Sequence, residues 1–151
     1  MIEMRTEINI AASPAVVWAV LVDFDHHPDW NPFAISISGR LDVGEKLSMH
    51  LNRPRPTGMV FYPVVTRVAK EKAFRFLGQF VIPSLFSGEH IFELAATDDG
   101  STRFIHREEF HGMVPAILGK SLDKIARRNY ETFNRAIKQR AESFPVEPDT
   151  H

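Results

Sequence analysis

Three things are missing from this sequence, and each absence excludes a class of protein. There is no cysteine, which rules out disulfide bonds, thiol catalysis and cysteine-based zinc sites. No apolar run approaches the ~18 residues needed to span a bilayer, so we expect no stable membrane insertion. The formal net charge is only −1, so no overall field attracts nucleic acid or an anionic membrane.

Local charge and the first residues support the same view. The basic clusters at Arg53 and Arg55 and at 120–128 lie between acids or on one helix face, which is typical of solvated surface and predicts no nucleic-acid partner. Met1–Met4 shows no basic segment followed by an apolar one, so we expect no secretory signal and a cytoplasmic location. Nothing in the composition points to a cofactor.

The length of the chain favours one domain. A chain of 151 residues buries roughly 68–70% of its unfolded surface, which is enough for a real core with a cavity beside it. We assign residues 1–144 to the domain. Residues 145–151 hold two prolines and two acids, and we predict a flexible tail there.

The first third of the chain predicts a strand followed by two short helices. Apolar and polar residues alternate over Met4–Ile10, which is typical of a half-buried strand. Ser13 followed by Pro14 is an N-cap and a first helical residue, and the helix should end near Asp23. A second short helix or turn is expected over Asp25–Trp30.

The rest of the chain predicts an antiparallel meander closed by a long helix. Short turn-rich segments separate six strand candidates, which are Phe33–Leu41, Lys46–Asn52, Gly58–Val68, Ala73–Val81, Phe86–Ala96 and Thr102–His111. From Val114 to about Glu142 the apolar spacing changes to three and four residues, which indicates an amphipathic helix. The loops at one end of such a meander carry an apolar group that we interpret as the mouth of a cavity, a lid or a contact surface; its members are Val81, Ile82, Leu85, Phe86, Met113 and Val114.

The last hairpin allows a register to be predicted. Asp98-Asp99-Gly100 suits a three-residue loop with glycine in the left-handed position, so Thr97 should pair with Ser101. The pairs Leu94–Phe104, Phe92–His106 and His90–Glu108 then follow. These residues share one face with Phe86 and Phe110, and we expect that face to point inward. We expect the opposite face, which includes Ile91, to be solvated.

Two histidines and a glutamate are therefore expected among phenylalanines on the concave surface. His90 and Glu108 are close enough to share a proton, and burial without a partner would be costly. Three interpretations of His90, His106 and Glu108 stay open. They form a satisfied polar cluster without chemistry, a polar anchor or general acid/base in an apolar pocket, or a metal site of two histidines and one carboxylate.

The sequence supports less specific predictions for several other polar, aromatic and glycine residues. His26 and His27 are expected at the surface, beside acidic neighbours. Trp30 and Phe33 are candidates for the core and for ligand contact. Gly88, inside a strand, suggests a bulge or a close backbone approach.

The order of elements resembles a known superfamily. The carrying motifs are Ser13-Pro14-Ala15-Val16-Val17-Trp18, Trp30-Asn31-Pro32-Phe33, Gly88-Glu89-His90-Ile91-Phe92 and His106-Arg107-Glu108-Glu109-Phe110. Over residues 3–142 the chain is similar to the START-like (SRPBCC) superfamily, and within it to the polyketide cyclase/dehydrase-like branch. The resemblance implies an α+β helix-grip fold, in which a curved antiparallel sheet wraps a long C-terminal helix around a large apolar cavity. No catalytic motif of characterised cyclases matches here, so no catalytic residue is carried over.

The predicted function is binding of a hydrophobic or amphipathic small molecule of lipid, polyketide or aromatic type. The predicted lining residues are Trp30, Phe33, Met49, Leu51, Phe76, Phe92, Phe104, Phe110, Leu118 and Leu122. The first alternative is a polyketide cyclase/dehydratase-like enzyme with His90 or His106 as base and Glu108 orienting it. The second is a protein-interaction module that uses the apolar rim around Ile82, Leu85 and Val114. The chain is expected to be a monomer or a homodimer.

Overall fold

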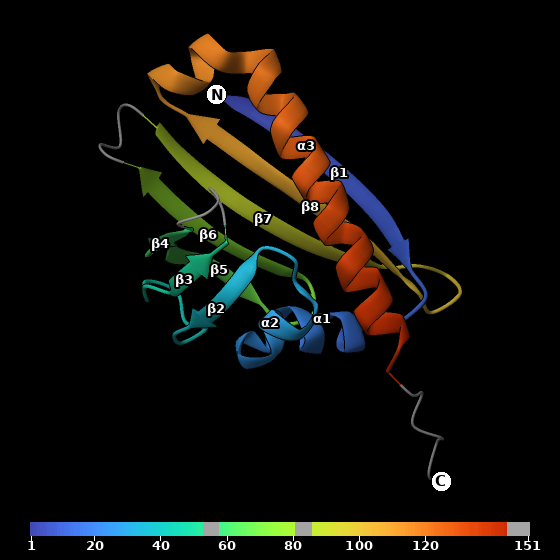
Figure 1. Ribbon diagram of the computed structural model, residues 1–151. Helices are drawn as coiled ribbons and strands as arrows, with labels where there is room; N and C mark the ends of the chain where they lie inside the picture. Colours follow the sequence, from blue (N-terminus) through green and yellow to red (C-terminus); the bar gives the residue numbers. More distant parts are fainter. Residues whose placement is uncertain (53–57, 81–85, 145–151) are drawn as a thin grey trace, which may run out of the picture.

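A computed structural model describes residues 1–52, 58–80 and 86–144, and the chain folds as predicted into an α+β helix-grip arrangement (Figure 1). Strand β1 (Ile2–Ile10) leads into α1 (Pro14–Val22), the 3-10 turn η1 (Phe24–His26) and α2 (His27–Trp30). The following strands are β2 (Ala34–Ser38), β3 (Ser48–Leu51), β4 (Met59–Phe61), β5 (Val64–Ala69), β6 (Ala73–Phe80), β7 (Phe86–Ala96) and β8 (Thr102–His111). Helix α3 (Met113–Glu142) then crosses the concave side.

Local signals explain where the first helix begins. The Ser13 side chain accepts a hydrogen bond from the backbone N–H of Val16 at 3.3 Å, and Pro14 occupies the first turn. The buried positions are Val17, Trp18, Val20 and Leu21, which face the core together. The predicted N-cap is therefore confirmed.

The strands form two antiparallel sheets. The larger sheet has the order β1-β8-β7-β6-β5, and the smaller has the order β2-β3-β4. The prediction of one uninterrupted strand over Gly58–Val68 is wrong, because the chain leaves the small sheet after Phe61 and enters the large one at Val64. Pro63 lies at this change of sheet, where it has no N–H to donate and its carbonyl accepts from Leu47 N at 2.9 Å.

The hairpin of β7 and β8 has the predicted register. His90 pairs with Glu108, Phe92 with His106 and Leu94 with Phe104. In the loop, Thr97 N donates to Ser101 O at 3.0 Å and Gly100 has φ +83°, as the three-residue turn requires. The inner face of this hairpin is thus defined by the turn.

The outer face departs from the prediction at Ile91. This side chain was expected to be solvated, but it is 0% exposed. Its cross-strand neighbours are Arg75 and Arg107, which pair with Glu89 at 3.5 Å and Glu93 at 2.6 Å. The apolar stems of the two arginines explain why an isoleucine on the outer face is buried.

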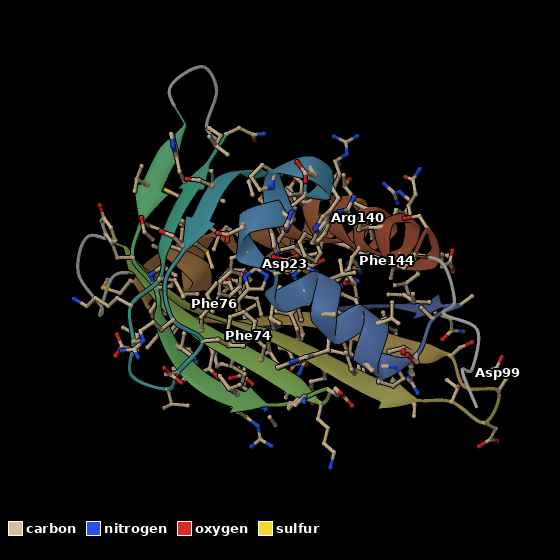
Figure 2. The ribbon with its side chains drawn as sticks, turned by 90° about the horizontal axis from the view of Figure 1, so that it is seen from below. Asp23, Phe74, Phe76, Asp99, Arg140 and Phe144 are labelled. Atoms are coloured by element: carbon tan, nitrogen blue, oxygen red, sulfur yellow. The ribbon has the colours of Figure 1, made fainter. Side chains whose placement is uncertain are left out.

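The core lies between the concave face of the sheets and the helices. Figure 2 shows Phe74 and Phe76 inside the molecule and Asp99 at the outer tip of the hairpin. Phe133, Ile137 and Ala141 of α3 pack into the main core cluster. The resemblance implies a cavity between the sheet and the last helix, and Phe74, Phe76 and Phe133 line such a space there.

Candidate functional site

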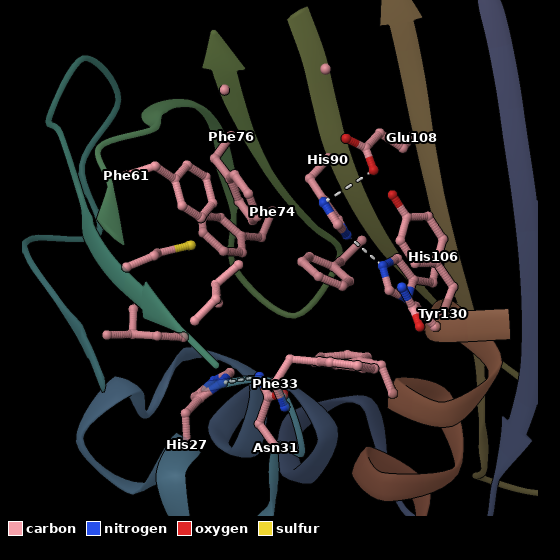
Figure 3. A pocket seen from close by; sticks show the side chains of 18 of the residues that line it. His27, Asn31, Phe33, Phe61, Phe74, Phe76, His90, His106, Glu108 and Tyr130 are labelled. Atoms are coloured by element: carbon pink, nitrogen blue, oxygen red, sulfur yellow. Dashed lines mark hydrogen bonds and ion pairs between the residues drawn. The ribbon is translucent and has the colours of Figure 1, made fainter. Parts of the chain in front are cut away.

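An internal cavity of about 280 Å³ lies between the sheets and the helices (Figure 3). Aromatic and aliphatic side chains form most of its wall. The lining residues are Leu21, Phe24, His27, Asn31, Phe33, Ile37, Met49, Leu51, Met59, Phe61, Phe74, Phe76, Gly78, Gly88, His90, Phe92, His106, Glu108, Asn129, Tyr130 and Phe133. The concave face is therefore not collapsed onto the helix.

Half of the residues predicted as ligand-binding lie in this wall: Phe33, Met49, Leu51, Phe76 and Phe92. Phe33 lies just before β2, and the other four lie in β3, β6 and β7, so the fold brings together segments that are distant in the sequence. The predicted polar residues His90, His106 and Glu108 also line the cavity.

Three other predicted residues lie outside the wall. Trp30 packs edge-on against Phe133, with ring centroids 5.4 Å apart. Phe104 is fully buried in the core, and Phe110 packs with Met4 in a smaller cluster. The inward face of β8 is longer than the cavity, so facing inward does not suffice for contact with it. The side chains of Leu118 and Leu122 lie outside the described part of the structure, as do those of the predicted rim residues Phe86 and Val114 and the whole of residues 81–85, which include Val81, Ile82 and Leu85.

Two glycines lie opposite each other on neighbouring strands in one side of the wall. Gly78 pairs with Gly88 across β6 and β7, and both line the cavity. The register is regular there, so the bulge expected at Gly88 is absent from this described pair. A Cβ at Gly88 would overlap the Glu108 Oε1 atom. The close approach predicted at this glycine is therefore that of the Glu108 carboxyl.

The polar corner of the cavity is a short chain of side chains. His90 Nδ1 lies 3.5 Å from Glu108 Oε2, and His90 Nε2 lies 2.5 Å from His106 Nε2 (Figure 3). The His90 ring stacks on Phe76 with centroids 4.9 Å apart, and Tyr130 of α3 stacks on His106 at 4.2 Å. His90 keeps 20% of its side-chain surface exposed and Glu108 keeps 13%, whereas His106 is only 2% exposed.

Two residues that sequence reasoning missed complete this chain. His106 Nδ1 is 2.9 Å from Asn134 Oδ1, and Asn134 Nδ2 donates to Thr6 Oγ1 at 2.8 Å. Both Asn134 and Thr6 are buried. The available signal was a polar residue on the apolar stripe of the last helix, together with Thr6 on the inward side of the first strand.

Burial controls the protonation of this corner. It raises the pKa of Glu108 to about 8 and lowers the pKa of His90 to about 3. Burial also holds the pKa of His106 well below its usual value, and the neighbouring His90 adds to that effect. His90 and Glu108 are therefore a neutral imidazole and a protonated carboxyl near pH 7. Their contact is not an ion pair.

A second polar group lies across the cavity, on α2. His27 was expected at the surface, but it is 4% exposed. Its Nε2 donates to the Leu21 carbonyl at 2.7 Å, and its Nδ1 accepts from Asn31 Nδ2 at 3.1 Å. Asn31 Oδ1 in turn accepts from the Phe33 N–H at 3.0 Å. The spacing of His27 and Asn31, one helical turn, was the sequence signal for this closed group.

The geometry does not suit a metal at His90, His106 and Glu108. A cation bound by two imidazoles lies about 2.0–2.1 Å from each nitrogen, and two nitrogens only 2.5 Å apart leave no room for it between them. Within residues 1–52, 58–80 and 86–144, no group of three or more His, Cys, Asp or Glu side chains is arranged to hold a metal ion.

Fold and cavity together define a helix-grip protein. The sequence profile of the family described as polyketide cyclase/dehydrase and lipid transport matches residues 1–142. The chain therefore belongs to this family, as the resemblance predicted. None of the curated proteins matches the sequence. In the part of the chain that the structure describes, no helix is both long and apolar enough to cross a membrane.

Solved structures with the same fold come from several bacteria. A START superfamily protein from Mycobacterium smegmatis is 20% identical with a TM-score of 0.75, and the match covers 93% of this chain and 97% of that one. The Zhui aromatase/cyclase from Streptomyces sp. R1128 is 14% identical with a TM-score of 0.74 and 93% coverage of both chains. A protein of unknown function from Staphylococcus aureus is 12% identical with a TM-score of 0.76 and 94% coverage of both. At these identities the similarity shows the fold alone.

Proposed function

We propose that this protein binds a hydrophobic or amphipathic small molecule of lipid, polyketide or aromatic type in its internal cavity. The observation that carries the proposal is an apolar cavity of about 280 Å³ with polar groups confined to a few positions. Ligand sites are typically apolar clefts of ~300–1,000 Å³ in which a few polar groups orient the ligand. Membership of a family that includes lipid transport supports the same reading.

The wall also suggests the shape of the ligand. Phe74, Phe76 and Phe92 present neighbouring rings, with centroids between 5.5 and 6.2 Å apart, and His90 continues the group. Flat rings gain offset-stacked and edge contacts on such a surface. A ligand with one or two rings or a short chain therefore suits the volume.

Blocking the cavity tests the proposal. Met59 lines the cavity, whereas the next residue, Val60, is 48% exposed on the other side of the same strand. With the neutral fluorescent probe N-phenyl-1-naphthylamine, we expect Met59→Trp to weaken binding by about tenfold or more, and Val60→Trp to leave it unchanged. Equal binding by both variants and the wild type would show that the probe does not use the cavity. Native mass spectrometry of freshly purified protein then gives the mass of any retained ligand.

A second candidate is an enzyme that cyclises or dehydrates a polyketide-like substrate. The observation that favours it is a protonated Glu108 beside a neutral His90, an acid and a base that both reach the cavity. His106 is buried with both ring nitrogens engaged, so in this reading it acts through His90. Turnover of a poly-β-ketone thioester should fall in Glu108→Gln and stay unchanged in Glu109→Gln, which alters the outer face. An unchanged rate in Glu108→Gln would remove the catalytic role.

A further inference from the structure

The hydrogen bonds behind the polar corner have one consistent direction, which begins at Thr6. Thr6 Oγ1 lies 2.9 Å from the carbonyl oxygen of His106, which can only accept, so the hydroxyl proton is used there. The group that faces the remaining lone pairs of Thr6 must donate, and this places the Asn134 NH₂ toward Thr6 at 2.8 Å. Asn134 Oδ1 is therefore the atom that faces His106.

The direction of the hydrogen bonds at Asn134 also determines which ring nitrogens of His106 and His90 carry a proton. Because Asn134 Oδ1 accepts, His106 Nδ1 carries the proton, and the neutral His106 offers a lone pair at Nε2. His90 Nε2 must then donate across the 2.5 Å contact, which leaves a lone pair on His90 Nδ1. Glu108 Oε2 lies 3.5 Å from that lone pair, which is longer than an ordinary hydrogen bond, and it is the carboxyl oxygen placed to hold the proton toward His90.

What remains for a ligand is the second carboxyl oxygen, Glu108 Oε1. Its proton-bearing partner faces His90, so Oε1 is a carbonyl-type acceptor, and it occupies the space that the absent side chain of Gly88 leaves. The lining contains no lysine or arginine among the described residues. The other groups that face Glu108 are His90 on β7, His106 on β8 and Tyr130 on α3, and Met4 pairs with it from β1.

We propose that the hydrogen bonds from Thr6 to His90, together with the 3.5 Å contact between His90 and Glu108, make the corner a receptor for an uncharged hydroxyl, so that the ligand is a neutral alcohol or phenol and not a carboxylate. The inference rests on the proposed binding function and names the ligand class for it. A hydroxyl donates to Oε1 and leaves its carbon skeleton on the aromatic wall. A carboxylate would meet no lysine or arginine in the described lining, so its charge would be buried without a cation.

Three molecules of nearly the same size and shape test the ligand class. They are 2-naphthylmethanol, 2-naphthoate and 2-methylnaphthalene, titrated by their own fluorescence near neutral pH, below the Glu108 pKa of about 8. We expect the alcohol to bind about tenfold tighter than the hydrocarbon and tighter still than the carboxylate. Equal binding of the alcohol and the hydrocarbon, or a preference for naphthoate, would overturn the ligand class and leave cavity binding intact. No binding of any of the three would count against both.

Variants identify the atom that receives the hydroxyl. Glu108→Leu should remove the advantage of the alcohol over the hydrocarbon, whereas Glu108→Gln should keep it, because the amide can donate to His90 Nδ1 and still present Oε1. Glu109→Leu on the outer face is the matched control. Tyr130→Phe should also keep the preference. Loss of the preference in Tyr130→Phe and its survival in Glu108→Leu would assign the receptor to Tyr130 and overturn the proposal.

Thr6 is a positioning residue in this scheme, and its test does not depend on ligand. Thr6→Val leaves Asn134 free to turn its amide, which reverses the proton positions on both histidines and presents a donor to Glu108. We therefore expect the pKa of Glu108, followed by carboxyl ¹³C NMR, to fall by about one unit or more in Thr6→Val. Thr6→Ser retains the hydroxyl and should restore the wild-type value. An unchanged Glu108 titration in a folded Thr6→Val protein would refute the directed chain.

Discussion

The cavity has two buried polar groups on opposite walls. One is hydrogen-bonded only to nearby protein atoms, whereas the other leaves an oxygen facing the cavity. His27 and Asn31 bond to each other, to the Leu21 carbonyl and to the Phe33 N–H, all within thirteen positions of the chain (21–33). The chain from Thr6 to Glu108 joins β1, α3, β8 and β7, and its last oxygen, Glu108 Oε1, faces the cavity.

This difference separates a structural polar group from one that can serve a ligand. Both ring nitrogens of His27 and both side-chain amide atoms of Asn31 have a backbone or side-chain partner, so this group holds α2 and the following turn together. The β7–β8 group brings a protonated acid and neutral imidazoles into an apolar wall, where a ligand can complete the hydrogen bonding. The comparison leads to predictions of decreasing size.

The largest expected effect is the contribution of Glu108 to the pH dependence of the unfolding free energy. Its pKa is raised from 4.5 to about 8 on folding, so the folded state keeps a proton that the unfolded state loses. This contribution to stability is complete below pH 4.5 and is lost as the pH rises through about 8. Relative to Glu108→Gln, the unfolding free energy of the wild type should fall by about 1.4 kcal/mol per pH unit across that interval.

Denaturant titrations at several pH values measure this difference. His90 contributes in the opposite direction, because its lowered pKa gives stability above pH 6.5 that is lost as the pH falls toward 3. Both proteins keep His90, so its contribution cancels in the comparison. Parallel curves for the two proteins would mean that Glu108 is ionised in the folded state.

A smaller but pH-independent loss is expected on the α2 side. Asn31→Ala removes the acceptor of the Phe33 N–H and the donor to His27 Nδ1, which leaves buried groups without partners. The unfolding free energy should drop by about 2–3 kcal/mol, measured by denaturant titration. Asp29→Ala, at an exposed position of the same helix, is the control. The alcohol preference of the folded variant should be unchanged, and a loss of that preference would contradict the structural role assigned to this group.

The smallest effect is expected at His26, the neighbour of His27. His26 Nδ1 pairs with Asp23 at 2.8 Å on the surface, and the carboxylate raises the pKa of His26. Because exposed pairs contribute little, His26→Ala should shift the melting temperature by no more than about 2 °C and leave probe binding intact. If His26→Ala lowered the melting temperature as much as Asn31→Ala does, the loss of stability would depend on position in this turn and not on burial.

Local signals explain which parts of this arrangement could be predicted. Asp98-Asp99-Gly100 and the two-residue alternation on either side set the β7–β8 register, and with it the inward direction of His90 and Glu108. Ser13-Pro14 set the start of α1. In each case the deciding interaction lies within a few residues of the pattern that reveals it.

The missed features depend on packing between distant elements. Asn134 and Tyr130 lie on the face of α3 that turns toward the core, but the helical period does not show which strand residue each of them meets. His27 is buried because α2 packs against β2. Ile91 is buried because its cross-strand neighbours Arg75 and Arg107 cover it. The change of sheet at Pro63 had a local signal in the proline itself, which the strong strand pattern around it concealed.

The pairing of the first strand with the last described strand has a consequence for synthesis of the protein. Thr6 is 100 positions before the carbonyl that it binds and 128 before Asn134, so β1 is synthesised well before the partners of Thr6. A nascent chain shorter than residue 134 has the hairpin of β7 and β8 but lacks the group that orients its histidines. On the proposal above, the histidines are therefore oriented for ligand selection only after α3 has been made and has packed against β1.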